Sequence, residues 1–250
     1  MDYKKKIVIV GATSAIAEHC ARLWLKDNPA RLILLGRNMS RLERIAQDLH
    51  VRSPDSSIQI VQAEFLDEHA ISKTVAQICS TGPVDIVLIA HGFLPDQDAC
   101  QTQLPACRQA LEINAISPVL YAEAFAHQMA EVNLGTIILI GSVAGERGRK
   151  SNYVYGAAKG LVTRYAQGLQ HRFAASNIKV ILVKPGPTDT PMTAHMKARG
   201  AKLASVEKVA QQIVDGTSAG RPVIYAPAKW LWIMMVVRHL PLFIFKRMNI

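Results

Sequence analysis

The feature that most constrains the fold of this chain is a regular alternation of short apolar runs with longer segments of helical spacing. The apolar runs, rich in β-branched residues, lie at 7–10, 31–35, 58–61, 85–90, 136–140, 180–183 and, more weakly, 222–225. The segments with helical spacing lie at 14–26, 40–50, 67–79, 104–131, 154–175 and 205–217. Strand runs without polar alternation are covered on both faces. We therefore predict an α/β fold: one domain with a doubly wound parallel sheet of about seven strands and helices on both faces.

Composition narrows the choice of partners. The 250 residues carry a formal net charge of +10, which raises the possibility of nucleic acid, an anionic lipid or an anionic substrate. The basic residues are scattered, with no zinc-ligand spacing and no aromatic-basic pattern of an RNA-binding sheet, so we expect no nucleic acid. The four cysteines lack C-x-x-C spacing and no export signal precedes them, so we expect free thiols, no metal and a cytoplasmic location.

A glycine turn follows the first apolar run. The sequence G-A-T-S-A-I-A places Gly11 before a helix for which Thr13 and Ser14 are candidate caps. Such a turn presents backbone N–H groups and the positive end of a helix to a phosphate. It resembles the T-G-x-x-x-G-x-G turn of the short-chain dehydrogenase/reductase family, in which Ala15 and Ala17 would replace two glycines. The resemblance, over residues 6 to about 225, implies a Rossmann-type fold.

Four residues match the Asn, Ser, Tyr, Lys set of that family in order and approximate spacing: Asn114, Ser142, Tyr155 and Lys159. Tyr155 and Lys159 are four residues apart, so on a helix their polar ends reach one ligand. The resemblance implies that Tyr155 donates a proton to the carbonyl oxygen and that Ser142 binds this oxygen. Lys159, together with the charged nicotinamide, would lower the tyrosine pKa. Lys159 would also hold the nicotinamide ribose, and Asn114 would position a water molecule. We expect Tyr153 to line the pocket.

The cofactor residues follow from the same resemblance. Arg37 comes directly after Gly36 at the end of the second run, where NAD-specific folds place an acid. An arginine there suits the 2′-phosphate, so NADP(H) is favoured over NAD(H). Glu64 stands where an aspartate usually contacts adenine, and His91 departs from the family pattern and is expected to be structural. The predicted cofactor contacts are Gly11, Thr13, Ser14, Ala15, Ile16, Arg37, Glu64, Phe65, Ala90, Gly92, Tyr155, Lys159, Pro185, Gly186, Thr188 and Thr190.

Two peripheral features bear on the substrate. Basic residues in G-E-R-G-R-K at 145–150, and in a mobile substrate lid at about 188–205, could receive a substrate phosphate or could be solvated loop charge. The apolar and basic tail at 229–250 follows the catalytic domain at 1–228. Its apolar part, even as one helix, would reach only about 24 Å at about 1.5 Å per residue, short of the roughly 30 Å hydrocarbon layer. It could lie on a membrane surface, at the inner face of the cell membrane, or pack against a second subunit.

Within the family, this combination resembles the reductases of polyprenyl-phosphoryl 2-keto-pentoses, which complete an epimerisation begun by a partner oxidase. The expected reaction is thus NADPH-dependent reduction of a ketone to a secondary alcohol, with a lipid-linked keto sugar as one candidate substrate. Acyl, steroid-like or soluble carbonyl compounds are alternatives, and a noncatalytic dinucleotide-binding scaffold is another. Family members commonly form homo-oligomers through two long helices, here 104–131 and 154–175.

Overall fold

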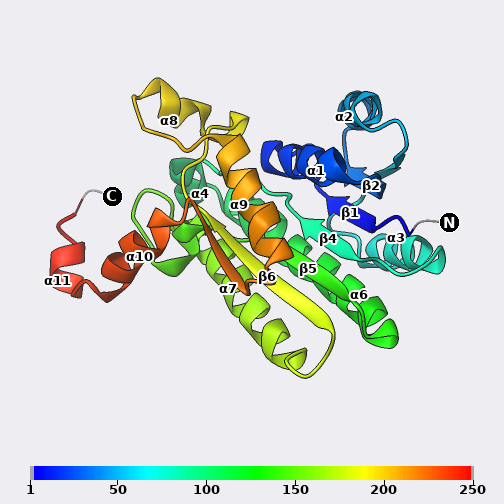
Figure 1. Ribbon diagram of the computed structural model, residues 1–250. Coiled ribbons are helices and arrows are strands. Elements are labelled where there is room, and N and C mark those ends of the chain that lie inside the picture. The colour runs from blue at the N-terminus through cyan, green and yellow to red at the C-terminus, as the bar shows by residue number, and fades with distance from the viewer. Residues whose placement is uncertain (1–2, 249–250) are drawn as a thin grey trace.

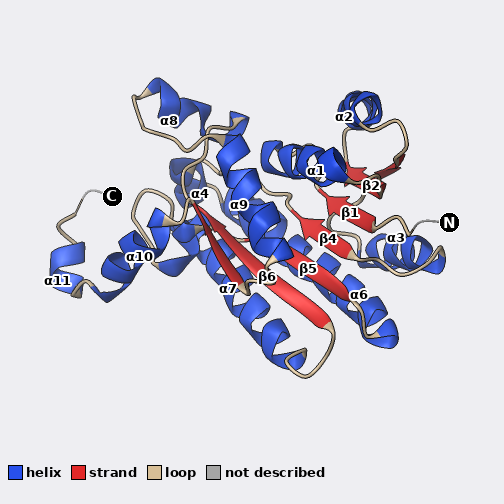
Figure 2. Ribbon diagram, in the orientation of Figure 1, coloured by secondary structure: helices blue, strands red, loops and turns tan. Residues whose placement is uncertain are grey.

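The seven predicted strands form one parallel sheet in the computed structural model, which describes residues 3–248 (Figure 2). The strands are β1 (Lys6–Val10), β2 (Arg31–Gly36), β3 (Ser57–Gln62), β4 (Ile86–Ile89), β5 (Gly135–Ile140), β6 (Ile178–Pro185) and β7 (Val223–Ala226). Their order is β3-β2-β1-β4-β5-β6-β7, and every neighbouring pair is parallel. The chain reverses its winding direction between β1 and β4, so the predicted doubly wound α/β fold is confirmed.

Alternate strand residues build two apolar cores, one on each face of the sheet. Val8 and Val10 belong to the core beneath α3, α6 and α7, whereas Ile7 and Ile9 belong to the core beneath α1, α2 and α9. This alternation follows from the two-residue period of a strand, and it explains why strands covered on both faces, such as β1 and β2, carry continuous apolar runs. Figure 1 shows the two helical layers on opposite sides of the sheet. The layer helices are α1 (Ala15–Asp27), α2 (Met39–Arg52), α3 (Glu68–Ser80), α6 (Ser117–Val132), α7 (Tyr153–Arg172) and α9 (Val206–Ser218).

The segment predicted as one helix at 104–131 is interrupted. It forms α5 (Leu104–Leu111), a π-helical turn η1 (Glu112–Ile116) and α6, and a short helix α4 (Gln97–Thr102) that the sequence analysis did not identify precedes it. The π-helical turn contains Asn114, so the irregularity lies at a predicted site residue. Single π-turns inside helices occur frequently at functional sites.

The segment predicted as a substrate lid forms a loop whose two ends are bridged. It contains a 3₁₀ turn η3 (Pro191–Thr193) and the short helix α8 (Ala194–Ala198). Thr188 and Ala204 form a β-bridge at its base, and the Ala204 N–H donates to the Pro187 carbonyl at 2.9 Å. The two ends of the lid are therefore held together beside the sheet edge.

The C-terminal tail forms two helices, α10 (Lys229–His239) and α11 (Leu242–Phe245), which project from one side of the body (Figure 1). Arg147, the C-cap residue of the 3₁₀ turn η2 (Val143–Glu146), holds them in place. Its guanidinium donates to the carbonyls of Val237 at 2.6 Å and Leu240 at 2.7 Å, and it lies 3.8 Å from the centre of the Phe245 ring. Among the described residues, no helix has the length and apolarity required to cross a membrane.

Glu146 connects the tail to the sheet. Its carboxylate lies 2.7 Å from the Lys184 ammonium on β6, and the two side chains are only 2% and 6% exposed. The Tyr225 hydroxyl on β7 donates to the same carboxylate, and the Arg238 guanidinium on α10 lies 3.6 Å from it. One buried carboxylate thus joins η2, β6, β7 and α10.

We expect Glu146→Ala to lower the free energy of unfolding by about 3–5 kcal/mol, because it leaves the buried Lys184 ammonium without its partner. Urea denaturation measures this loss. Glu43→Ala, which removes an exposed carboxylate from α2, is the control and should change the stability by less than about 0.5 kcal/mol. Equal losses of stability for Glu146→Ala and Glu43→Ala would contradict a stabilising role for the buried Glu146–Lys184 ion pair.

Candidate active site

A cavity of about 900 Å³ opens at the carboxyl ends of the strands, where the winding of the sheet reverses. A doubly wound sheet binds ligands at this position. All predicted site residues line the cavity except Asn114 and Glu64. The structure therefore brings together side chains from the first and the last third of the chain.

The glycine turn after β1 forms one wall of the cavity. Gly11 has a φ of +83°, and a Cβ atom on it would lie 2.6 Å from His91, so only glycine fits. Ser14 is the N-cap residue of α1, but its side chain makes no capping hydrogen bond. Ser14, Ala15 and Ile16 line the cavity at the N-terminus of α1, so this helix end is a suitable cradle for a pyrophosphate. Ala17 is fully buried against the sheet, as expected for its small side chain.

Two arginines lie at the outer end of the cavity beyond β2. The exposed Arg37 places its guanidinium 5.3 Å from the centre of the Phe65 ring. Arg41, on the first turn of α2, donates to the Thr13 carbonyl at 3.1 Å. The sequence analysis overlooked Arg41, because its place at the cavity depends on this tertiary contact with the glycine turn. These arginines and Phe65 suit the phosphate-bearing adenosine half of a dinucleotide.

Glu64 lies outside the cavity. Its side chain is exposed, and its backbone carbonyl accepts a hydrogen bond from the Tyr121 hydroxyl at 2.6 Å. The adjacent Phe65 lines the cavity instead. Side chains alternate in direction along extended backbone, so only one of the two neighbours can face the ligand. The assignment of adenine contact to Glu64 stays a prediction without support from this geometry.

His91 fills the space beneath Gly11. Its ring stacks on Phe65 with a centroid separation of 4.4 Å, and its Nε2 atom lies 2.8 Å from the Ser117 hydroxyl. Burial, with smaller contributions from Lys159 and Arg37, lowers its pKa to about 3. The imidazole is therefore neutral at physiological pH, in agreement with the structural role expected from the sequence.

Ser142, Tyr155 and Lys159 come together on the inner wall of the cavity. Ser142 follows β5, and its Oγ atom accepts a hydrogen bond from the Ala144 N–H at 3.1 Å. Tyr155 and Lys159 lie one turn apart on α7, with the ammonium 5.9 Å from the centre of the tyrosine ring. The Lys159 ammonium donates to the Ile140 carbonyl at 2.9 Å, which fixes it at the end of β5.

The protonation states of this group differ in part from expectation. Burial raises the pKa of Tyr155 to about 12, although its hydrogen bond with Ser142 acts in the opposite direction. Burial also lowers the pKa of Lys159 to about 8. In the protein alone, removal of the phenolate from water is the largest effect on the tyrosine pKa, and the lowering expected from Lys159 together with a charged nicotinamide stays a prediction. At neutral pH the phenol retains its proton, which is the form that a proton donor requires.

Asn114 stands behind the cavity wall and is fully buried. Its Nδ2 atom donates to the Ala110 carbonyl at 2.9 Å, and its Oδ1 atom accepts from the Phe93 N–H at 2.9 Å. A Cβ atom on Gly92 would lie 2.7 Å from that Oδ1 atom, so glycine permits the approach. Asn114 thus connects the π-helical turn η1 to the loop after β4.

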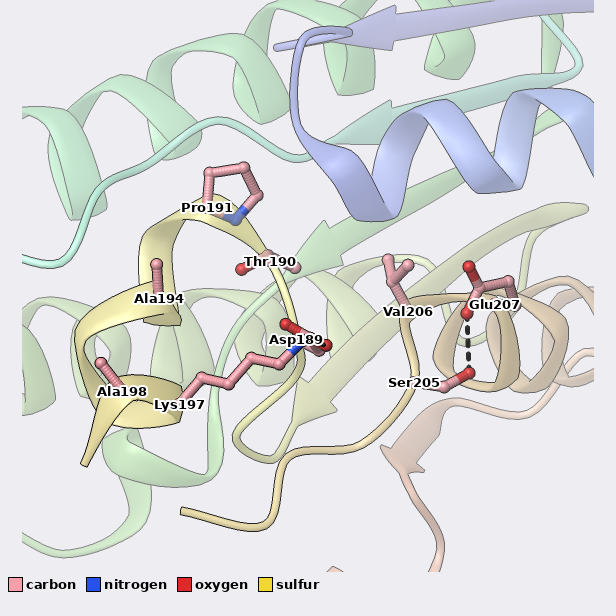
Figure 3. Close-up of a pocket in the computed structure, with 9 residues that line it drawn as sticks. All are labelled: Asp189, Thr190, Pro191, Ala194, Lys197, Ala198, Ser205, Val206 and Glu207. Carbon is pink, nitrogen blue, oxygen red and sulfur yellow. Dashed lines mark hydrogen bonds and ion pairs between the residues drawn. The ribbon is translucent and has the colours of Figure 1, made fainter. Parts of the chain in front are cut away.

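The cations expected at the cavity rim have separate roles. Arg147 binds the tail, and Lys197 on α8 forms an ion pair with Asp189 at 2.5 Å. Figure 3 shows this pair beside a second, open hollow between the lid and α9. Arg149 lines the main cavity. Tyr153, expected to line the pocket, is instead 44% exposed and outside the lining, because it lies two residues from Tyr155 on a helix and faces elsewhere.

The tail reaches the cavity wall at one point. Gly186, in the P-G segment after β6, has the Trp230 indole where its own Cβ atom would be, so only glycine fits at this position. Gly186 also lines the cavity, and the Thr188 hydroxyl donates to its carbonyl at 2.9 Å. This segment is therefore held between the tail and the ligand space.

The sequence of residues 5–200 matches the family model of the short chain dehydrogenases. The chain belongs to the short-chain dehydrogenase family. The "uncharacterized oxidoreductase in mprA 5′ region" of Streptomyces coelicolor is 27% identical over 245 residues, which cover 98% of this chain and 96% of that protein. As a short-chain dehydrogenase, the protein is an NAD(P)-dependent oxidoreductase.

Solved structures agree with the fold. A short-chain dehydrogenase from Sphingobium yanoikuyae in complex with NADPH superposes with a TM-score of 0.82 at 20% identity, over 95% of this chain and 97% of that one. The bulky-bulky ketone specific alcohol dehydrogenase from Comamonas testosteroni gives a TM-score of 0.80 at 20% identity, over 99% and 96% of the two chains. The short-chain dehydrogenase fold thus extends over nearly the whole chain.

Proposed function

We propose that this protein reduces a ketone to a secondary alcohol with NADPH. The observation that carries the proposal is the convergence of Ser142, Tyr155 and Lys159 on one wall of the cavity, with Tyr155 protonated at neutral pH. Such a group can hold a carbonyl oxygen and give it a proton. An intact group of this kind argues against a noncatalytic scaffold.

The residues have distinct tasks in the proposed reaction. When bound, NADPH supplies the hydride that forms the new C–H bond at the carbonyl carbon. Ser142 positions the carbonyl oxygen, and Tyr155 transfers its phenolic proton to that oxygen as the C=O bond becomes a single bond. Lys159, fixed by the Ile140 carbonyl, stabilises the phenolate that remains. By resemblance to the family, Asn114 supports the water that returns the proton.

Preference for NADPH over NADH is part of the proposal. Arg37 and Arg41 lie together at the outer end of the cavity, and the acidic residue of the described lining, Glu18, is already paired with Arg22. Two guanidinium groups can bind a 2′-phosphate through charge-assisted hydrogen bonds. A ribose hydroxyl offers them no such charge.

The tail supports a substrate that resides in a membrane. Its exposed apolar side chains are Leu231, Trp232, Ile233, Met235, Val236, Leu242, Phe243 and Ile244. Lys229, Arg238, Lys246 and Arg247 accompany them, and residues 229–248 contain no aspartate or glutamate. An apolar face with flanking cations suits the surface of an anionic bilayer. We therefore propose peripheral attachment at the inner face of the cell membrane, with 229–250 as a tail on the catalytic domain.

A lipid-linked keto sugar is the substrate that best combines these features. The sequence resembles the reductases of polyprenyl-phosphoryl 2-keto-pentoses, and the cavity of about 900 Å³ accommodates a bulky ketone. The Comamonas testosteroni enzyme, described as specific for bulky-bulky ketones, has the same fold.

The protein is also proposed to form a homo-oligomer through α6 and α7. The side chain of Leu161 on α7 is 43% exposed and is a candidate contact between subunits.

Tyr155→Phe should reduce ketone turnover by about 10²- to 10⁴-fold, because it removes the proton donor, and it should leave the NADPH Kd nearly unchanged. Steady-state NADPH oxidation and fluorescence titration measure the two quantities. Tyr153→Phe, on the same helix but outside the cavity, is the matched control. Substantial turnover by Tyr155→Phe would defeat the assignment.

Arg37→Ala should weaken NADPH binding by about 10- to 100-fold and leave NADH binding nearly unchanged, because a charge-assisted bond to the 2′-phosphate is lost. Titration with each dinucleotide tests this. Arg44→Ala removes an exposed cation of α2 that lies outside the cavity and should have no such effect. Equal weakening for both dinucleotides would count against NADPH preference.

The combined substitution Trp232→Ser, Val236→Ser and Phe243→Ser should abolish binding to vesicles that contain anionic lipid, because it removes apolar side chains that are 63–70% exposed. Co-sedimentation with vesicles measures the binding, and size-exclusion chromatography reports the oligomeric state. Leu104→Ser, at an 83% exposed residue of α5, is the control. Dissociation of an oligomer with unchanged vesicle binding would identify the tail as a subunit interface instead.

A further inference from the structure

We propose that Arg149 binds an anionic group of the substrate, a phosphate ester in the first instance, and that Asn152 binds a substrate hydroxyl beside it. This inference deepens the proposed function and rests on it. It assigns substrate recognition to the turn between η2 and α7, a segment distinct from the arginines at the outer end of the cavity.

Arg149 is the basic residue of the 145–150 segment that lines the cavity, whereas Lys150 beside it is exposed and lies outside the lining. Arg147 is engaged with carbonyls of the tail, and Lys197 is paired with Asp189. Within residues 3–248, the guanidinium of Arg149 has neither an ion pair nor a hydrogen bond. It is half-buried in the lining of the cavity, and burial lowers its pKa. The cost of its partial removal from water is therefore not offset by the protein itself.

The charge balance of the cavity leaves Arg149 available. Glu18 is the acidic residue among the described lining residues, and it already forms an ion pair with Arg22 at 2.5 Å. Lys159 is held at the Ile140 carbonyl. An anion that enters the cavity thus meets an arginine without a competing carboxylate. A guanidinium binds phosphate and carboxylate through two parallel hydrogen bonds, which suits a fixed substrate position.

Asn152 gives independent support for a polar ligand at this turn. Its N–H donates to the Arg149 carbonyl at 3.1 Å, so the two residues belong to one turn. The Oδ1 atom of Asn152 is buried, lines the cavity with its residue and has no hydrogen-bond partner among the described residues. A buried acceptor without a partner is costly, and a donor hydroxyl on a ligand would satisfy it. An acceptor beside a free arginine fits a hydroxylated, phosphorylated ketone better than an apolar one.

The first test measures binding without turnover. Calorimetric titration uses phenyl phosphate and the full-length protein saturated with NADP⁺, so that Arg37 and Arg41 are already occupied. We expect Arg149→Gln to weaken phenyl phosphate binding by about 10- to 100-fold, the usual effect of removing a charge-assisted hydrogen bond. Lys150→Gln, which removes an exposed neighbouring cation outside the cavity, should leave binding unchanged. Equal binding by wild type and both variants would overturn the proposal.

The second test compares matched ketones: a ketose phosphate and its unphosphorylated parent. Arg149→Gln should raise KM for the phosphorylated ketone and leave kcat, and both constants for the parent, nearly unchanged. Equal effects on both ketones would contradict anion recognition. If wild type binds phenyl phosphate through Arg149 but reduces neither ketone, the anion site stands and the proposed reaction fails.

A third test compares a phosphorylated substrate that is free in solution with one that is anchored in a membrane. The same phosphorylated ketone is offered free in solution and as a prenyl phosphodiester in vesicles. A dependence on Arg149 in both forms supports one anion site that serves either source. A dependence on Arg149 in neither form would contradict the proposal.

Discussion

The structure depends on burial of a parallel sheet on both faces. This constraint makes the covered strands mainly apolar, so the polar residues of the site gather where strands end, and the reversal of winding between β1 and β4 opens a space there. Gly11 at the end of β1 and Ser142 after β5 both stand at that edge. Close packing at this edge also restricts which residues fit. Position 11 must be glycine, because a Cβ atom there would overlap His91. The site is a consequence of how the sheet is covered.

The same burial determines the chemistry of the inner wall. Removal from water raises the pKa of Tyr155 to about 12 and lowers the pKa of Lys159 to about 8, so burial moves the two pKa values apart and disfavours the charged form of each group. A protonated phenol suits ketone reduction. The peripheral cations are each used differently: Arg147 holds the tail, Lys197 pairs with Asp189, and Arg149 faces the cavity.

Much of the fold and of the inner site could be predicted from the sequence, because both depend on local patterns. Apolar runs gave the strands, and a four-residue spacing placed Tyr155 and Lys159 together. Features that depend on tertiary contacts could not be predicted in this way. Arg41 and Arg147 are recognisable only once α2 meets the glycine turn and η2 meets the tail. The interruption of the long helix at Asn114 gave no sequence signal, and the neighbours Glu64 and Phe65 could be told apart only by direction.

The central claim is hydride transfer from NADPH to a ketone carbon at the wall formed by Ser142, Tyr155 and Lys159. The most direct measurement is incubation of the purified protein with NADPH deuterated at the nicotinamide C4 position and a polyprenyl-phosphoryl 2-keto-pentose, followed by mass spectrometry of the sugar product. The account predicts one deuterium on the new carbinol carbon, together with stoichiometric NADP⁺. NADPH oxidation without deuterium in the product, or no reaction with this ketone or with bulky soluble ketones, would contradict it.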